Sequence, residues 1–236
     1  MKEKIIGILG GMGPEATAEL FMNIIRATPA KKDQDHIRVI IDSNSKIPDR
    51  TSAIMGKGPS PLPEIVRTAE NLEKAGVDFI IIPCNTAHYF YGELSKSVRV
   101  PILNMVELTA EAIHEKFSGI RRVGLIATTG TVKSGIYHRA LGKYGFEVLW
   151  PPWRLQDKVM EAIYSYIKTG RISEGKEIIG SVVSELVEGS VEAVICGCTE
   201  VSLVLKEGDI PVPVVDPLQI LAKTSVAIAL GRKERL

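Results

Sequence analysis

Two cysteines lie at matching places in the two halves of this 236-residue chain. Cys84 stands in PCNTAH after the apolar run FIII, and Cys198 stands in GCTEVS after the apolar run VEAVI. A thiol directly before a helix gains from the amide dipoles of that helix, which favour the thiolate. Two thiols placed in this way, each after a strand and before a helix, could face one substrate from opposite sides. A reaction that inverts a carbon centre requires such an arrangement.

Hydrogen-bonding side chains accompany both cysteines. Asn85 and Thr86 follow the first and Thr199 follows the second, so each can donate a hydrogen bond to sulfur or to a substrate oxygen. A packing role is the alternative for either cysteine alone, because free cysteine is among the most buried residue types. The matched placement of the two thiols favours a catalytic role over a packing role.

The third cysteine, Cys196, lies inside the strand predicted before Cys198. No third and fourth ligands follow at a spacing that suits zinc, so we interpret Cys196 as a core residue and expect no metal site. Three cysteines cannot all pair, and their positions suit strand ends better than a disulfide framework. We expect reduced thiols in a cytoplasmic protein.

Two further segments are candidates for substrate contacts. GGMGP (10–14) lacks the glycine spacing of a dinucleotide site and the Lys-Ser/Thr of a P-loop, so its glycines favour close approach of a small ligand. Thr128, Thr129 and Thr131 offer hydroxyl groups near a predicted helix start, a place that suits a carboxylate.

Two cations complete the candidate set. Arg50 lies in NSKIPDRT, and an arginine fork matches a carboxylate bidentately. Lys168 ends the helical segment VMEAIYSYIK. The alternatives are a solvated loop charge for Arg50 and a cation favoured by a helix C-terminus for Lys168.

Apolar runs of strand length alternate with segments of helical period, which predicts an α/β fold with mainly parallel sheets flanked by helices. The first half predicts three strands and two helices, at residues 5–9, 14 onward, 37–42, 63–75 and 77–82. Leu20, Phe21, Ile24 and Ile25 form the apolar stripe of the first helix. Residues 43–63 are too long for a plain connection, and we expect them to be functional.

The second half repeats the order of the first. Three segments match three others, namely 122–131 with 5–14, 191–200 with 77–86, and 212–221 with 100–109. Parallel strands resemble one another, but this alone does not explain why the cysteine and a valine-proline pair recur at the same stage. The pattern predicts a duplicated α/β unit and two similar lobes with approximate twofold symmetry.

Ligands of open α/β sheets bind beyond the carboxyl ends of the strands, so a cleft between the lobes would present both cysteines. The expected lobes are residues 1–105 together with 212–236, and residues 106–211. Residues 217–232 have helical period and are expected to pack back on the first lobe.

The composition excludes several classes of protein. Twenty-nine basic and 28 acidic side chains give a net charge of +1, which offers no case for binding nucleic acid or an anionic membrane. No apolar run approaches the roughly 18 residues needed to span a bilayer. MKEKIIGILGG does not have the pattern of a signal peptide, because glycines interrupt its apolar stretch.

The motifs GGMGPEAT, IPDRT, PCNTAH, IATTGT and GCTEV, in this order, resemble the aspartate/glutamate racemase family, and within it the archaeal-type aspartate racemases. The resemblance runs from Ile5 to beyond Asp216. It implies a cofactor-independent amino acid racemase with two lobes, commonly a homodimer. It also implies that Cys84 and Cys198 are the catalytic pair, that Arg50 binds a substrate carboxylate, and that Lys168 is its basic companion.

Two departures favour the aspartate branch. Glutamate racemases have a histidine where this chain has Glu200, and they open with an Asp-Ser-Gly motif where this chain has GGM. The full set of expected substrate contacts is Met12, Arg50, Asn85, Thr86, Thr128, Thr129, Thr131, Lys168, Thr199 and Glu200. His88 receives no catalytic role.

The expected activity is interconversion of L- and D-aspartate by proton transfer through two cysteines, with no cofactor and a small acidic amino acid as the partner. The alternatives are racemisation of glutamate or other amino acids, or isomerisation or decarboxylation of a dicarboxylate. A small-ligand binding protein without turnover and a thiol-redox protein are the alternatives from other classes.

Overall fold

The computed structural model describes residues 3–233; residues 1–2 and 234–236, which the predicted first lobe includes, lie outside the described part. The chain forms two compact units. The first consists of the residues up to Met105 and those from Leu218 on, and the second of Val106–Pro217. Each is built on a parallel sheet with flanking helices, which confirms the predicted α/β class.

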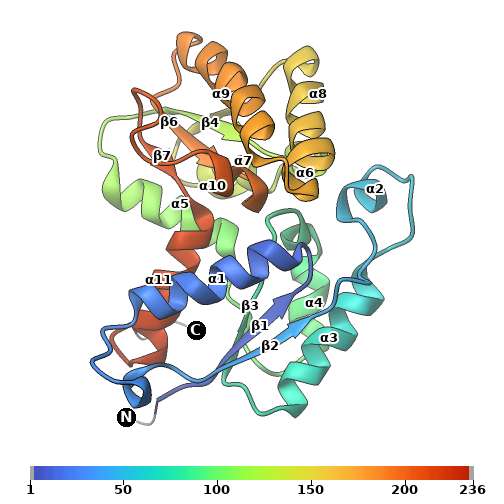
Figure 1. Cartoon of the computed structure of the whole chain (residues 1–236), viewed down its shortest axis with the longest axis vertical. Coiled ribbons are helices and arrows are strands. Elements are labelled where there is room, and N and C mark those ends of the chain that lie inside the picture. Colours follow the sequence, from blue (N-terminus) through green and yellow to red (C-terminus); the bar gives the residue numbers. More distant parts are fainter. Residues whose placement is uncertain (1–2, 234–236) are drawn as a thin grey trace. The chain divides into compact units, whose positions relative to one another are not determined.

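The first unit has a three-stranded sheet in the order β2-β1-β3. Helices α1 and α3 flank this sheet (Figure 1). The elements of the unit are β1 (Ile6–Gly10), α1 (Pro14–Ala27), η1 (Asp33–Asp35), β2 (Val39–Ser43), α2 (Arg50–Ile54), α3 (Leu62–Lys74), β3 (Phe79–Ile81), η2 (Thr86–Phe90), α4 (Tyr91–Ser97) and α11 (Pro217–Ala229).

Helix α1 illustrates how the sequence specifies an element. Pro14 occupies its first turn, where a missing backbone N–H costs nothing. Of the predicted apolar stripe, Leu20 and Ile24 are buried, whereas Phe21 and Ile25 are partly covered. Burial of a side chain of this size stabilises a fold by about 1.5–3 kcal/mol, so the stripe fixes which face of α1 packs on the sheet.

The second unit has a four-stranded sheet in the order β5-β4-β6-β7. Its main core lies between this sheet and helices α8 and α9. The elements are α5 (Met105–Lys116), β4 (Arg122–Ile126), α6 (Thr129–Ser134), α7 (Ile136–Gly142), β5 (Glu147–Leu149), α8 (Trp153–Glu161), the π-helix η3 (Ala162–Tyr166), η4 (Ile167–Thr169), α9 (Ile172–Glu188), β6 (Ala193–Cys196), α10 (Thr199–Val204) and β7 (Val214–Val215).

The two sheets share one strand order. In each, the strand that precedes the cysteine motif pairs with the first strand of its unit, β3 with β1 and β6 with β4. Ile80 N donates to Pro101 O at 2.8 Å, and Val194 N donates to Pro213 O at 2.9 Å. A bridge between Ile80 and Ile102 therefore stands in the first unit where β6 pairs with β7 in the second. The matching segments of the sequence thus fold alike, as a duplicated unit requires.

Three details differ from the sequence-based expectations. The long connection at 43–63 contains a helix, α2, which begins at Arg50. Residues 212–217, expected with the first lobe, belong to the second unit, because β7 pairs in parallel with β6. The segment that ends at Lys168 is not one regular helix, because α8 continues into a wider π turn and then a tighter 3-10 turn.

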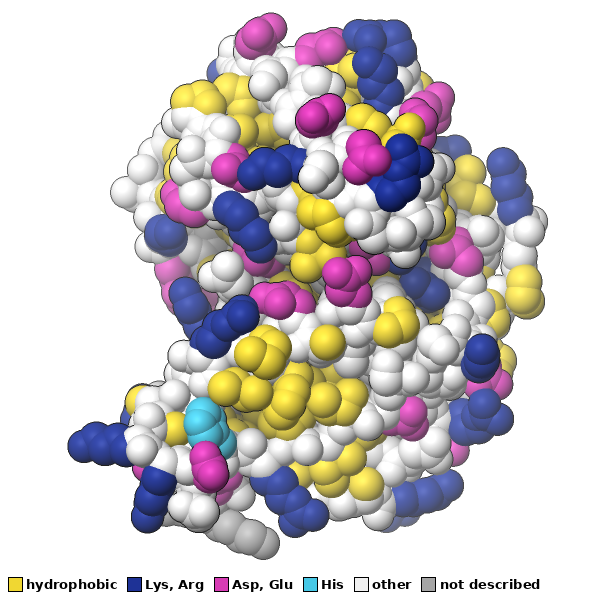
Figure 2. Space-filling view, in the orientation of Figure 1, with side chains coloured by type: hydrophobic (Ala, Val, Ile, Leu, Met, Phe, Trp, Pro, Cys, Tyr) yellow, Lys and Arg dark blue, Asp and Glu magenta, His cyan; other side chains and the backbone are white. Residues whose placement is uncertain are grey.

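The chain returns to its first unit through α11. Leu218, Leu221 and Val226 of this helix are buried, and Ala229 O accepts a hydrogen bond from Lys4 N at 3.2 Å. Within residues 3–233, none of the helices is both long and apolar enough to cross a membrane. Basic and acidic side chains are interspersed on the face drawn in Figure 2, in line with the near-zero net charge.

Candidate active site

Cys84 follows the end of β3 in the first unit and is buried, with 6% of its surface exposed. Its backbone N–H donates to Ile82 O at 2.9 Å, which turns the chain sharply after the strand. Asn85 and Thr86 follow at the start of the 3-10 helix η2 and are buried as well. The strand, the turn and the short helix together fix the position of the thiol.

His88 holds the backbone of this turn. Met105 N donates to His88 Nε2 at 3.1 Å, so this nitrogen carries no proton, and Nδ1 therefore donates to Cys84 O at 2.8 Å. Burial lowers the pKa of His88, although hydrogen bonds to the backbone of Cys84, Leu103 and Asn85 oppose the effect. Both ring nitrogens of His88 therefore hydrogen-bond to the backbone and fix the turn that carries Cys84.

The glycine-rich loop before α1 is held by Thr17, which sequence reasoning missed. Its hydroxyl accepts from Gly11 N at 2.9 Å and donates to Gly13 O at 2.8 Å. Gly11 has φ +88°, and a Cβ there would lie 2.3 Å from the backbone of Asn44. A threonine one turn into a helix that follows a glycine loop is the only signal for this role in the sequence. The loop is built for a close approach of two backbone segments.

The structure brings Arg50 to this loop. The Arg50 guanidinium donates through Nη2 to Met12 O at 3.2 Å and through Nη1 to Pro48 O at 3.2 Å. Met12 packs in the same buried cluster as Cys84 and Ile47. Asp49 caps the helix that begins at Arg50 by accepting from Ser52 N at 2.7 Å. Four predicted substrate contacts, Met12, Arg50, Asn85 and Thr86, thus lie in the first unit together with the predicted catalytic residue Cys84.

In the second unit, Cys198 precedes α10 and is buried, with 7% of its surface exposed. The Cys198 thiol donates to Glu200 Oε2 at 2.9 Å, and Thr199 Oγ1 donates to the same oxygen at 3.2 Å. The other oxygen, Glu200 Oε1, accepts a hydrogen bond from Lys168 Nζ at 2.5 Å. Lys168 also lies over the ring of Tyr164, 5.6 Å from its centroid. Four of the predicted residues therefore form one connected group.

The charges of this group shift its proton equilibria in opposite directions. Burial raises the pKa of the Cys198 thiol, and the charge of Glu200 adds to the rise, while Lys168 opposes it. For Glu200, burial alone would raise the pKa, but the Lys168 charge and the bonds from Cys198 and Lys168 outweigh burial and hold it below the ordinary value. The favoured state is a neutral thiol beside an ionised carboxylate.

The threonine loop after β4 lies in the same unit. Thr128 caps α6 by accepting from Thr131 N at 3.2 Å, and the two hydroxyl groups lie 3.2 Å apart. Gln156 of α8, fully buried, donates to Ala127 O at 2.9 Å and to Thr129 Oγ1 at 3.3 Å. Gln156 therefore positions this loop. Its polarity on an apolar helix face was the available signal, and sequence reasoning did not use it.

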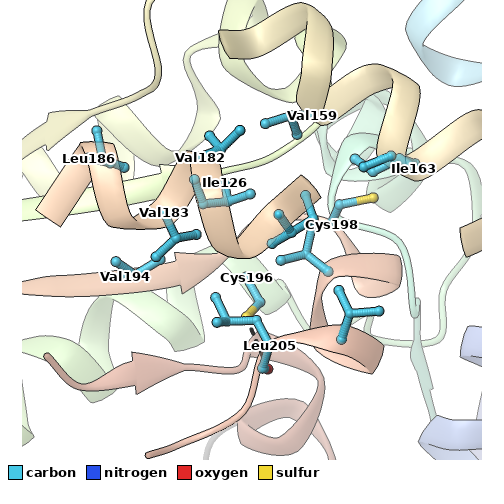
Figure 3. Close-up of a cluster of buried hydrophobic side chains, with 14 of the residues drawn as sticks. Ile126, Val159, Ile163, Val182, Val183, Leu186, Val194, Cys196, Cys198 and Leu205 are labelled. Atoms are coloured by element: carbon cyan, nitrogen blue, oxygen red, sulfur yellow. Dashed lines mark hydrogen bonds between the residues drawn. The ribbon is translucent and has the colours of Figure 1, made fainter. Parts of the chain in front are cut away.

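Cys196, two residues before Cys198, has a different environment. It is fully buried in the core between the sheet and α9, which confirms its interpretation as a core residue. Figure 3 shows its side chain directed toward Leu205, whose carbonyl oxygen lies 3.9 Å from the sulfur, and Cys198 next to Ile163. Burial raises the pKa of Cys196, and Asp216 adds to the rise.

The described residues thus form two separate groups, one in each unit. The first holds one thiol and an arginine, and the second holds one thiol with a lysine–carboxylate pair and the threonine loop. Within residues 3–233, no three His, Cys, Asp or Glu side chains come together as a metal ion would require. The thiols of these groups can transfer protons, and their cations can bind anions electrostatically.

Comparisons with known proteins agree with these features. A family model described as Asp/Glu/Hydantoin racemase matches residues 9–224. The broad specificity amino-acid racemase RacX of Bacillus subtilis is 29% identical over 240 residues, covering 96% of this chain and 99% of RacX. The structure is similar to that of Picrophilus torridus aspartate racemase, with a TM-score of 0.86 and 35% identity over 96% of this chain and 94% of that one. It is also similar to an aspartate racemase homologue from Pyrococcus horikoshii OT3, with a TM-score of 0.77 and 28% identity over 96% of this chain and 99% of that one.

Proposed function

Because the chain belongs to the Asp/Glu/Hydantoin racemase family, we propose that it interconverts L- and D-aspartate by proton transfer through Cys84 and Cys198, without a cofactor. The observation that carries the proposal is the equivalent position of the two buried thiols, each directly after the equivalent strand of a duplicated unit. The likeness to Picrophilus torridus aspartate racemase supports aspartate as the substrate.

The proposed reaction needs a base on one face of the α-carbon and an acid on the other. One cysteine, as thiolate, takes the α-proton, and the electron pair left on carbon takes the S–H proton of the other cysteine. The first cysteine ends as a thiol and the second as a thiolate, so atoms and charge balance. The mechanism requires both thiols to reach one substrate molecule.

The intermediate carbanion needs electrostatic stabilisation. We assign Arg50 and Lys168 to the side-chain carboxylate of the substrate, and the amide and hydroxyl donors beside the cysteines and in the threonine loop to its α-carboxylate. An ammonium group can donate three hydrogen bonds, so the contact of Lys168 with Glu200 is compatible with a second carboxylate. Arg50 contacts the loop of Met12, which links the cation to the glycine-rich segment.

The pair of thiols should titrate as a unit, because two thiolates on one substrate site repel each other. The productive state has one proton shared between the two sulfurs. Racemisation is therefore expected to fall at low pH, where both are protonated, and at high pH, where neither can donate. The result is a bell-shaped pH dependence.

A second candidate is racemisation of a wider range of amino acids. The 29% identity with the broad specificity racemase RacX, over nearly the full length of both chains, favours it. The two candidates differ in the role of Arg50 and Lys168, because a substrate without a side-chain carboxylate would leave the binding energy of these cations unused.

Chiral chromatography of a panel of amino acids, incubated with purified protein and no added cofactor, separates the candidates. Aspartate racemase activity predicts that both enantiomers of aspartate converge on the racemate, with glutamate and neutral amino acids at least about tenfold slower, as loss of a well-placed charge contact implies. Comparable rates for neutral amino acids would favour the broad specificity. Binding of aspartate with no change in either enantiomer of any amino acid of the panel would overturn racemisation altogether.

A further inference from the structure

The thiol of Cys198 lies beside a carboxylate that is itself almost fully buried. Glu200 is 6% exposed, and its Oε2 lies 2.9 Å from Cys198 Sγ, while its Oε1 lies 2.5 Å from Lys168 Nζ. Thr199 Oγ1 adds a third donor to the carboxylate. The carboxylate therefore receives donors on both oxygens, and one of these donors is the thiol.

Charge balance decides where the proton of this pair lies. If both Cys198 and Glu200 were ionised, two buried anions at 2.9 Å would face one cation, Lys168. One proton therefore stays between sulfur and oxygen. The ordinary pKa values of a thiol and a glutamate differ by about four units, so the proton favours sulfur by roughly ten-thousand-fold, and Lys168 strengthens this preference.

We propose that Glu200, held by Lys168, is a positioning residue that keeps the proton on Cys198, so that Cys198 is the thiol from which the substrate receives its proton. The claim that Cys198 protonates the substrate rests on the proposed function. In that step the thiolate of Cys84 takes the α-proton, the carbanion takes the proton of Cys198, and the Cys198 S–H bond breaks as the new C–H bond forms. Reaction of the opposite enantiomer requires Cys198 first to lose its proton to solvent and Cys84 to gain one from solvent.

The ratio of rates in the two directions cannot test this assignment. Enantiomers have equal free energies, so kcat/KM must be the same for L- and D-aspartate in any variant. Titration of the thiol itself is the direct measurement. The titratable groups that interact electrostatically with Cys198 are Glu200 from α10, Lys168 from η4 and Tyr137 from α7. Burial raises the pKa of Tyr137, so this phenol stays neutral through the range in which a thiol titrates.

The experiment compares the parent chain with Glu200→Gln and with Glu188→Gln. Gln preserves the size of the side chain and removes its charge, and Glu188 is an exposed residue at the end of α9 that provides the same charge change as a control. Alkylation of Cys198 by iodoacetamide is followed across pH by mass spectrometry of its peptide. The compared quantity is the pH at the midpoint of the alkylation rate profile of each protein. This midpoint reports ionisation of the Cys198 thiol, whereas the absolute rate also depends on access of iodoacetamide to the sulfur.

The proposal predicts a parent midpoint above about 8.5, the ordinary cysteine value. E200Q should lower the midpoint by at least about one unit, which is a tenfold faster reaction at a pH below it, and E188Q should leave it unchanged. An unchanged or higher midpoint in E200Q would overturn the proposal, because Glu200 would then be withdrawing the proton. A parent midpoint at or below about 8.5 would overturn it even if E200Q failed to fold.

The titration needs no substrate, so its failure can be told apart from failure of the proposed function. A raised midpoint in a chain that racemises no amino acid would leave the proton assignment intact and overturn the racemase. A low midpoint in an active racemase would overturn the proton assignment and leave the proposed function intact.

Discussion

At the scale of single residues, the neighbours of a cysteine decide what its thiol can do. Cys196 and Cys198 lie two positions apart, yet one packs in the core near Leu205 and the other contacts a buried carboxylate. The sequence indicates which of them matches Cys84, because the motifs align. It does not indicate that Glu200, expected among the substrate contacts, also contacts Lys168, because the two lie 32 residues apart and only the fold joins them.

Burial of Cys196 predicts a measurable loss of stability at alkaline pH. Its pKa is raised in the folded chain, so its stabilising contribution is fully present below the ordinary value of about 8.5. Above that pH the unfolded chain releases the proton and the folded chain keeps it. The free energy of unfolding should therefore fall by about 1.4 kcal/mol per pH unit for this group, until the raised value is reached.

In Cys196→Ala, the free energy of unfolding should fall less steeply with pH than in the parent, by about 1.4 kcal/mol per pH unit between roughly pH 9 and 10.5. Urea unfolding followed by tryptophan fluorescence measures it, because Trp150 and Trp153 both lie in the second unit. The variant also loses packing, but that loss is the same at every pH. Parallel curves for parent and variant would show that the Cys196 proton does not contribute.

At the scale of elements, the loop after β1 depends on one glycine. Gly11 has φ +88°, and its position would place a Cβ 2.3 Å from the backbone of Asn44. Gly56 provides a matched control, since it has φ +69° but no atom within 4 Å of the same Cβ position. Only the first glycine combines an unfavourable conformation with a clash.

Gly56→Ala is expected to lower the free energy of unfolding by about 1–2 kcal/mol, the cost of the left-handed conformation for a residue with a Cβ. Gly11→Ala should cost at least about 3 kcal/mol, because backbone must also move. Denaturant unfolding of both variants checks the difference. Equal losses would mean that the close approach of the two segments is easily relaxed.

The sequence predicted the elements that depend on local pattern and missed those that depend on tertiary contacts. Strands and helices of the first half follow from apolar runs and helical period, and the parallel sheets follow from their alternation. Helix α2 was missed, because its five residues are specified by the Asp49 cap and by the contact of Arg50 with Met12. The placement of residues 212–217 was missed as well, because β7 has only two residues and its pairing decides its unit.

At the scale of the whole molecule, each of the two units contains half of the candidate chemistry. The first holds Cys84 and Arg50, and the second holds Cys198, Lys168 and Glu200. The chain leaves the first unit at α5 and returns through α11, so the second unit is one continuous segment inserted between the two segments of the first. The proposed two-base reaction would need both units, and the likeness of the two units explains why each supplies one thiol at the equivalent position.

The most direct test of the two-thiol account is racemisation of aspartate in deuterated water by the parent, Cys84→Ala and Cys198→Ala. Cys196→Ala is the matched control, since it removes a core thiol of the same chain. The parent and the control should lose optical activity as deuterium enters the α-position. Each catalytic variant should racemise at least about a hundredfold more slowly, the lower bound for loss of a positioned acid or base. Racemisation at the parent rate by either C84A or C198A would contradict the account.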